Sequence, residues 1–152
     1  MKIIEAYIDG ATRGNQFDKN LGAWAVILKY GENITEFGEV IENTTNNICE
    51  ISAAIGALNK IKNKTIKTIV ISDSQYVISG INEWSLKWKL NGWETARNKP
   101  IKNVGLWRWL LDLVSEFDDI TFQKCEGHSN NEWNNKVDAY CNKLLDEYKK
   151  EN

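Results

Sequence analysis

The chain has 152 residues, 42% hydrophobic and 26% charged, which is the size and composition of one globular domain and excludes a disordered protein. Its net charge of −2 does not by itself indicate nucleic-acid binding. No apolar stretch could cross a membrane, and the N-terminal apolar run is too short for a signal peptide. The cysteines lack the spacing of a CxxC pair or a zinc site, which predicts buried, reduced thiols in a cytoplasmic protein: Cys49, Cys125 and Cys141.

The first part of the chain has the pattern of three antiparallel strands joined by turns. We predict strands at Lys2–Asp9, Gly22–Lys29 and Asn33–Ile41, separated by the polar loop Gly10–Asn20 and a turn at Tyr30–Glu32. Apolar residues then recur at helical spacing from Ile48 to Ile61, after capping candidates at Thr44 to Asn46.

Helices and two more strands follow in alternation. The β-branched run Lys67–Ser72 predicts a central parallel strand, and Ile120–Lys124 predicts the last strand. We expect helices at Ser74–Ile81, Asn82–Lys89 and Ile101–Glu116, and a final helix opened by a capping box of Ser129 and Glu132. The order β-β-β-α-β-α-α-β-α predicts one α/β domain over residues 1–152, a mixed sheet with helices on its faces.

Four acidic residues lie where an apolar stretch meets a polar turn or a helix. Asp9 and Asp73 each close a predicted strand at the same sheet edge, where α/β folds bind ligands. Glu50 and Asp138 can reach this edge from flanking helices. Converging like charges are costly unless cations neutralise them, and oxygen ligands without cysteine or histidine favour Mg²⁺ or Mn²⁺ over zinc. The alternative is that these are four of 21 scattered acids that cap helices or face solvent.

A basic segment runs from Lys87 to Arg108. It holds six basic residues and one acidic residue, a local charge of +5, whereas the rest of the chain holds 13 basic and 20 acidic residues. A basic patch on an acidic body is typical of nucleic-acid binding. Five of the seven tryptophans lie in or beside this segment, and packing within a protruding helix–loop–helix explains Trp84, Trp88 and Trp107.

Six segments resemble the type 1 ribonuclease H family, in the family's order and over nearly the whole chain. They are YIDGATRGN, TTNNICEISAAIGAL, ISDSQYVISGINEW, KWKLNGWET, NKPIKNVGLW and EGHSNNEWNNKVDAY. The resemblance implies a ribonuclease H-like α/β fold, with three antiparallel and two parallel strands in a five-stranded mixed sheet flanked by helices. It also implies a metal-dependent endoribonuclease that hydrolyses the RNA strand of RNA–DNA hybrids by two-metal-ion catalysis, leaving 3′-hydroxyl and 5′-phosphate ends.

The resemblance also implies site residues. Asp9, Glu50, Asp73 and Asp138 match the family's four metal-binding catalytic carboxylates, which implies two Mg²⁺ ions per site, with Mn²⁺ as a substitute. His128 matches a loop histidine that assists proton transfer or product departure. It is the only histidine in the chain, and imidazole titrates near neutrality.

Substrate contacts follow from the same match. Asn46, Asn47 and Gln75 match positions that contact the minor groove and the RNA 2′-hydroxyls, and amides can both donate to and accept from a hydroxyl. Judged without the family, the two asparagines are helix caps, and the two roles can coexist. Further matched positions are Trp93 at a DNA sugar, Thr45 near a DNA phosphate, and the lysines of the protrusion at phosphates: Lys87, Lys89, Lys99 and Lys102.

The loop after Asp9 departs from the family pattern. It reads ATRGNQFDKNLGAW, so it keeps Gly14 and Asn15 but is charged and lacks the family's proline. The match retains Asn15 as a substrate contact, and the departure does not touch the four carboxylates.

Two other functions compete with this interpretation. A non-catalytic module for hybrid or double-stranded RNA would not need four carboxylates beside phosphates. A related nuclease, such as a resolvase or integrase core, would not need the TTNN segment and the basic, tryptophan-rich protrusion. We therefore expect a monomeric ribonuclease H without an obligate protein partner.

Overall fold

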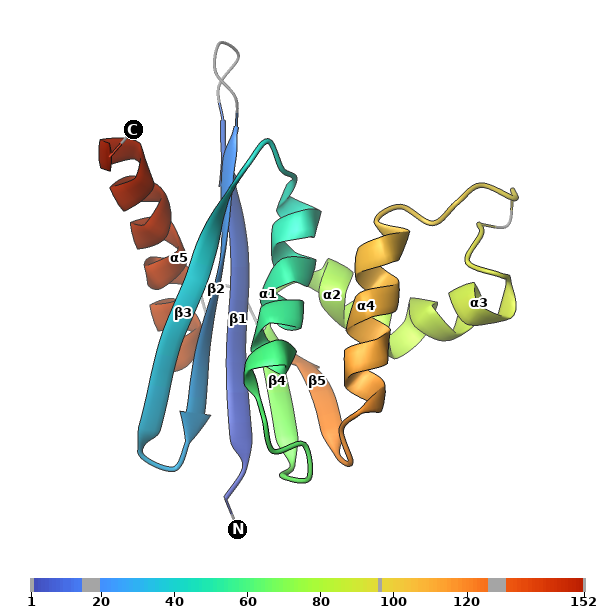
Figure 1. Ribbon diagram of the computed structural model, residues 1–152, viewed down its shortest axis with the longest axis horizontal. Helices are drawn as coiled ribbons and strands as arrows, with labels where there is room; N and C mark the ends of the chain where they lie inside the picture. The colour runs from blue at the N-terminus through green and yellow to red at the C-terminus, as the bar shows by residue number, and fades with distance from the viewer. Residues whose placement is uncertain (1, 15–19, 96, 126–130, 152) are drawn as a thin grey trace.

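Five strands form one mixed sheet at the centre of the molecule. The computed structural model describes residues 2–14, 20–95, 97–125 and 131–151, and the sheet order is β3-β2-β1-β4-β5 (Figure 1). The β1–β2 and β2–β3 pairs are antiparallel and the β1–β4 and β4–β5 pairs are parallel, which confirms the predicted fold class. The strands are β1 (Ile4–Arg13), β2 (Leu21–Tyr30), β3 (Asn33–Glu42), β4 (Thr68–Ser72) and β5 (Ile120–Lys124).

Helices cover both faces of the sheet. Helix α5 packs on one face, and α1 and α4 lie on the other (Figure 1). Helix α3 and the chain after it project away from the sheet. The helical segments are α1 (Asn46–Lys60), α2 (Gln75–Ser79), the π-helix η1 (Gly80–Trp84), α3 (Ser85–Leu90), α4 (Val104–Ser115) and α5 (Glu132–Glu151).

Each face of the sheet carries its own core because successive side chains of a strand point to opposite faces. In β1, Ala6 and Ile8 belong to the larger core under α1 and α4, whereas Tyr7 belongs to the smaller core under α5. The larger core also holds Trp107, which is fully buried. The central strand is therefore fixed from both sides just before it reaches Asp9.

Strand β1 runs beyond Asp9, so the prediction that Asp9 ends the strand is wrong. Its antiparallel pairing with β2 continues from Asp9↔Ala25 to Arg13↔Leu21. Its parallel pairing with β4 stops at Tyr7↔Ile71. Asp9 therefore lies inside β1, but beside the point where the neighbouring strand β4 ends. The end of β4 is what brings Asp73 near Asp9.

The helix predictions need three corrections. The two helices expected from Ser74 to Lys89 are one continuous run in which the π-helix η1 joins α2 to α3. Helix α4 begins at Val104 and not at Ile101, because Asn103 takes a left-handed conformation (φ 60°). Helix α5 is capped by Asn131, whose Oδ1 accepts hydrogen bonds from the N–H groups of the second and third helical residues at 3.0 Å. The observed N-cap is therefore Asn131, and Ser129 of the expected capping box lies outside the described residues.

Two other expectations concern the interior and the membrane. All three cysteines are buried and none forms a disulfide, which confirms the prediction of buried thiols. No helix in the described part of the chain has the length and hydropathy that a membrane span requires.

Candidate active site

Three carboxylates meet where β4 ends beside β1. Asp9 comes from β1, Asp73 directly follows β4, and Glu50 comes from the second turn of α1. One oxygen of each lies within 4.8 Å of one oxygen of each of the others. Asp9 and Glu50 are 5% exposed, whereas Asp73 is half-buried. The cluster therefore has two acids at its base and one toward its opening.

Gly10 allows α1 to approach β1 at this point. A Cβ atom at Gly10 would lie 2.6 Å from the backbone carbon of Cys49 and 2.7 Å from the backbone nitrogen of Glu50. Such distances are too short for any side chain, so only glycine permits this contact between strand and helix. The close contact places Glu50 beside Asp9.

Burial changes the protonation of the two inner acids. Burial raises the pKa of Asp9 to about 8, and the charge of Asp73 adds to the shift. Burial likewise raises the pKa of Glu50 to about 9, with further contributions from Asp9 and Asp73. A hydrogen bond from the Gly10 N–H acts on both groups in the opposite direction. Without a cation, both inner acids are therefore protonated more readily than ordinary carboxyl groups.

The cluster fits a divalent metal ion. Asp9 Oδ2 and Glu50 Oε2 are buried and have no hydrogen-bond partner among the described residues. Buried carboxylate oxygens without a donor are costly, and a cation would satisfy both at once. Because all the ligand atoms are hard oxygens, the site suits Mg²⁺ or Mn²⁺ better than zinc.

Asp138 stands apart from this group of three. It is exposed on α5, and its carboxyl group adds to the rise in the pKa of Asp9. The structure thus brings together three of the four predicted acids closely and places the fourth at their rim.

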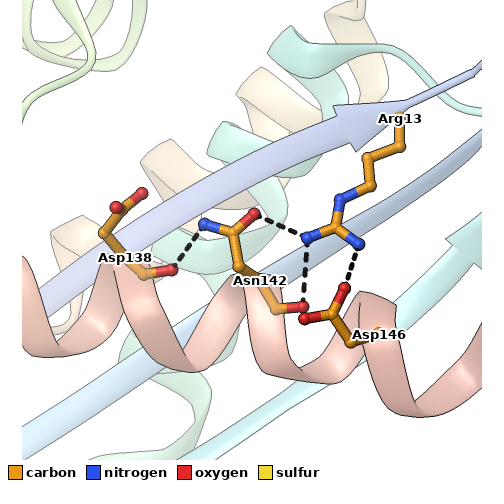
Figure 2. A network of polar contacts seen from close by, with 4 residues as sticks. All are labelled: Arg13, Asp138, Asn142 and Asp146. Carbon is orange, nitrogen blue, oxygen red and sulfur yellow. Dashed lines mark hydrogen bonds and ion pairs between the residues drawn. The ribbon is translucent and has the colours of Figure 1, made fainter.

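A polar network ties the Asp138 segment to β1 (Figure 2). Arg13 of β1 donates hydrogen bonds to Asn142 Oδ1 at 3.0 Å and to the Asn142 backbone oxygen at 3.3 Å, and it forms an ion pair with Asp146. Asn142 Nδ2 donates in turn to the Asp138 backbone oxygen at 3.1 Å. Strand β1 and helix α5 are therefore joined by Arg13 and Asn142, which lie four residues after Asp9 and Asp138.

The predicted RNA-contacting residues flank the acids. Thr45 is the N-cap of α1, because its Oγ1 accepts from the Ile48 N–H at 3.1 Å. Asn46 and Asn47 are thus in the first helical turn and do not cap the helix. Gln75 is exposed at the start of α2, where its Oε1 accepts from Lys124 Nζ at 2.7 Å and its Nε2 donates to Ser79 Oγ.

The basic segment from Lys87 to Arg108, called the protrusion, packs around an aromatic cluster. The rings of Trp88 and Trp107 lie 5.2 Å apart, as do those of Tyr76 and Trp107, and the Tyr76 hydroxyl accepts from Trp107 Nε1 at 2.9 Å. Trp93 packs beside Trp88, lies 5.5 Å from the Arg108 guanidinium and has a left-handed backbone (φ 64°). The predicted phosphate contacts on this protrusion are all exposed: Lys87, Lys89, Lys99 and Lys102.

The comparisons with known proteins agree with this arrangement. The RNase H family model matches residues 1–145. The chain belongs to the RNase H family. The ribonuclease H of Clostridium botulinum is 42% identical over 149 residues, which cover 97% of this chain and 99% of that protein. The ribonuclease H of Ruthia magnifica is 41% identical over 146 residues, with coverage of 96% and 97%. Membership makes the protein an enzyme and implies dependence on divalent metal ions.

Solved structures share the same architecture. The chain aligns with the RNase H1 of the archaeon Halobacterium salinarum with a TM-score of 0.69 and 26% identity, covering 95% of this chain and 98% of that one. It aligns with the PFV RNase H domain with a TM-score of 0.74 and 26% identity, covering 94% and 92%. LC9-RNase H1 gives a TM-score of 0.76 at 22% identity, covering 91% and 70%, which shows the fold alone.

Two predicted residues, Asn15 and His128, lie outside the described residues. Sequence reasoning in turn missed three residues that shape the site: Gly10, Arg13 and Lys124. Gly10 had a local signal, since glycine inside a strand often marks a site where another backbone approaches closely. The partners of Arg13 and Lys124 are distant in sequence, so no local pattern indicated them.

Proposed function

We propose that this enzyme hydrolyses the RNA strand of RNA–DNA hybrids, with Asp9, Glu50, Asp73 and Asp138 holding two Mg²⁺ ions. The observation that carries the proposal is the acid cluster beside β4, where two buried oxygens lack partners among the described residues. Mn²⁺ has similar ligand preferences and is expected to substitute.

The acids divide the work according to their burial. Asp9 and Glu50 are fixed by the packing of α1 against β1, so they hold cations in a set position. Asp73 and Asp138 are more exposed, which leaves their oxygens accessible to a substrate. Two divalent cations, when bound, supply Lewis acidity that activates water and stabilises the leaving oxygen. The family resemblance adds 3′-hydroxyl and 5′-phosphate products, and a role for His128 in proton transfer or product departure.

Recognition of RNA falls to amide side chains around the acids. Asn46, Asn47 and Gln75 can both donate to and accept from a 2′-hydroxyl, which is the group that distinguishes RNA from DNA. Capping by Thr45 leaves both asparagine amides outside the helix-capping role, which supports the proposal. By the family match, Asn15 also contacts the substrate and Thr45 lies near a phosphate of the DNA strand.

Recognition of DNA falls to the protrusion. The exposed side chains of Lys87, Lys89, Lys99 and Lys102 are suited to neutralise phosphates, and Trp93 is suited to contact a sugar. We further propose a cytoplasmic monomer without an obligate protein partner. Size-exclusion chromatography with light scattering should then give a single species near 17.4 kDa.

A cleavage assay tests the proposal. With Mg²⁺ or Mn²⁺, the purified protein should cut the RNA strand of a hybrid and spare double-stranded DNA and single-stranded RNA. Asp73→Asn should abolish cleavage, while Asp112→Asn, the same change at an exposed acid on α4, should not. Activity that survives Asp73→Asn would refute the metal assignment. Hybrid binding by the wild type without cleavage in either metal would favour the non-catalytic module.

A further inference from the structure

Lys124 lies at the same edge of the sheet as the acid cluster. It is the last residue of β5 and pairs with Ser72 of β4 in the parallel register. The pairing extends one step further, because the Cys125 N–H donates to the Ser72 carbonyl at 2.7 Å. Asp73 directly follows Ser72, so Lys124 is one strand away from a metal-site acid.

The Lys124 side chain points toward α2. Side chains alternate along β5, so Lys124 shares its face with Phe122, which is buried in the core beneath α1 and α4. Its Nζ reaches Gln75 Oε1 at 2.7 Å, and both residues are exposed. An ammonium group can only donate, so this bond fixes which end of the Gln75 amide faces Lys124. The amide nitrogen accordingly faces Ser79.

The positively charged Lys124 is thus hydrogen-bonded to Gln75, which is assigned to the RNA strand. The lysines already assigned to phosphates all belong to the protrusion. The Lys124 ammonium has three N–H donors, and its bond to Gln75 uses one of them. It is therefore suited to contact a phosphate oxygen while Gln75 contacts the neighbouring sugar.

We propose that Lys124 binds a phosphate of the RNA strand, next to the nucleotide whose 2′-hydroxyl Gln75 contacts. This inference rests on the proposed function, which supplies the role of Gln75. Lys124 thereby holds the RNA strand in register with the carboxylates, whereas the protrusion holds the DNA strand.

Charge removal at the two ends of neighbouring strands tests the contact. Lys124→Met should raise KM for the hybrid roughly tenfold at low salt and reduce the slope of log KM against log salt by about 1. The control is Lys67→Met, because Lys67 is also exposed but directly precedes β4 at the opposite edge. Lys124→Arg should keep most of the affinity. Equal salt slopes for Lys124→Met and Lys67→Met would overturn the proposal.

Neutral linkages then locate the phosphate. Hybrids carrying one methylphosphonate at a 2′-deoxy position of the RNA strand remove a single charge at a chosen site, and binding is measured without divalent metal. The wild type should lose affinity at one linkage, and Lys124→Met should show no loss there. A loss shared by both proteins at every RNA linkage, or a Lys124-dependent loss at a DNA linkage, would overturn the proposal. Because binding is measured without cleavage, failure of the nuclease assignment remains distinguishable from failure of this contact.

Discussion

Single residues decide how closely the acids meet, and Gly10 is the clearest case. It sets the separation between β1 and α1, so the position of Glu50 depends on the absence of a side chain on another element. The nearest atoms in this contact belong to the backbone of α1 and not to the acid side chains.

We predict that Gly10→Ala destabilises the protein by about 1–3 kcal/mol, because the new methyl group overlaps the α1 backbone. The same variant should also bind Mn²⁺ more weakly, because α1 moves Glu50 away from Asp9. Urea denaturation and calorimetric Mn²⁺ titration measure the two effects.

The control for this change is Gly105→Ala in α4. A Cβ atom at Gly105 would meet no other atom within 4 Å, so this variant should gain roughly 0.5–1 kcal/mol from helix propensity. Destabilisation of both variants by the same amount would contradict the packing argument.

The position of Asp138 depends on how helix α5 is held against strand β1. Helix α5 is held to β1 by Arg13, which contacts a carbonyl, an amide and a carboxylate on two successive turns of the helix. A planar guanidinium can serve several acceptors at once, which a lysine ammonium does less well.

We predict that Arg13→Ala costs about 0.5–1.5 kcal/mol of folding free energy in urea denaturation, and that Arg13→Lys restores less than half of this loss. Lys143→Ala breaks an exposed pair with Glu147 at 3.9 Å on the same helix and should cost at most about 0.5 kcal/mol. Equal effects of Arg13→Ala and Lys143→Ala would show that Arg13 makes only an ordinary surface ion pair.

The proposed DNA contacts of the protrusion can be tested separately from the acid cluster. Lys99→Ala combined with Lys102→Ala should raise KM for the hybrid and reduce its salt dependence by roughly one unit per lost phosphate contact, with little change in kcat. Kinetics at several salt concentrations measure this. Equal losses at all salt concentrations would count against phosphate contacts by these lysines.

The sequence predicts the elements well where one periodicity dominates, and poorly where a distant partner decides. Both parallel strands and α1 follow from local apolar patterns. The continuation of β1 past Asp9 does not, because Gly10 to Arg13 lack an apolar alternation and are held in the strand by their pairing with β2. The π-helix begins at Gly80, where a Cβ atom would lie 2.0 Å from the Trp107 ring, and this contact across 27 positions of the chain has no local sequence signal.

The same distinction applies to the site. The types and spacing of the four acids indicate a metal site, and the neighbouring motifs indicate the family. Asp9 and Glu50 are buried whereas Asp138 is exposed. This difference depends on how the helices pack on the sheet, so no local sequence pattern indicates it. Asn131 likewise caps α5 although Ser129 and Glu132 have the better motif.

For the whole molecule, we expect the acid cluster to make the free energy of unfolding depend on pH and on metal. The raised pKa values mean that the folded state holds protons which the unfolded state has already lost. Stability of the metal-free protein should therefore be greatest in acid and fall as the pH rises from about 4 through 8 to 9.

We predict that thermal unfolding in a chelator shows this decline and that excess Mg²⁺ reverses much of it, because cations bind only the folded site. Asp9→Asn should be less sensitive to pH, with a melting temperature above that of the wild type by several degrees at pH 8 in chelator. For a chain of this size, roughly 2–4 °C corresponds to 1 kcal/mol. Parallel pH profiles of the two proteins would contradict the burial of this charge.

The three thiols sit in different parts of the architecture: Cys49 in α1, Cys125 beyond β5, and Cys141 in α5. Cys49 and Cys141 are completely buried on opposite faces of the sheet, and burial raises the pKa of both, so neither can meet an alkylating reagent until its helix lifts. Their labelling rates in the native protein therefore time the opening of each helical layer separately. Cys49 and Cys141 are thus native probes for the local opening of α1 and α5, the two helices that carry Glu50 and Asp138.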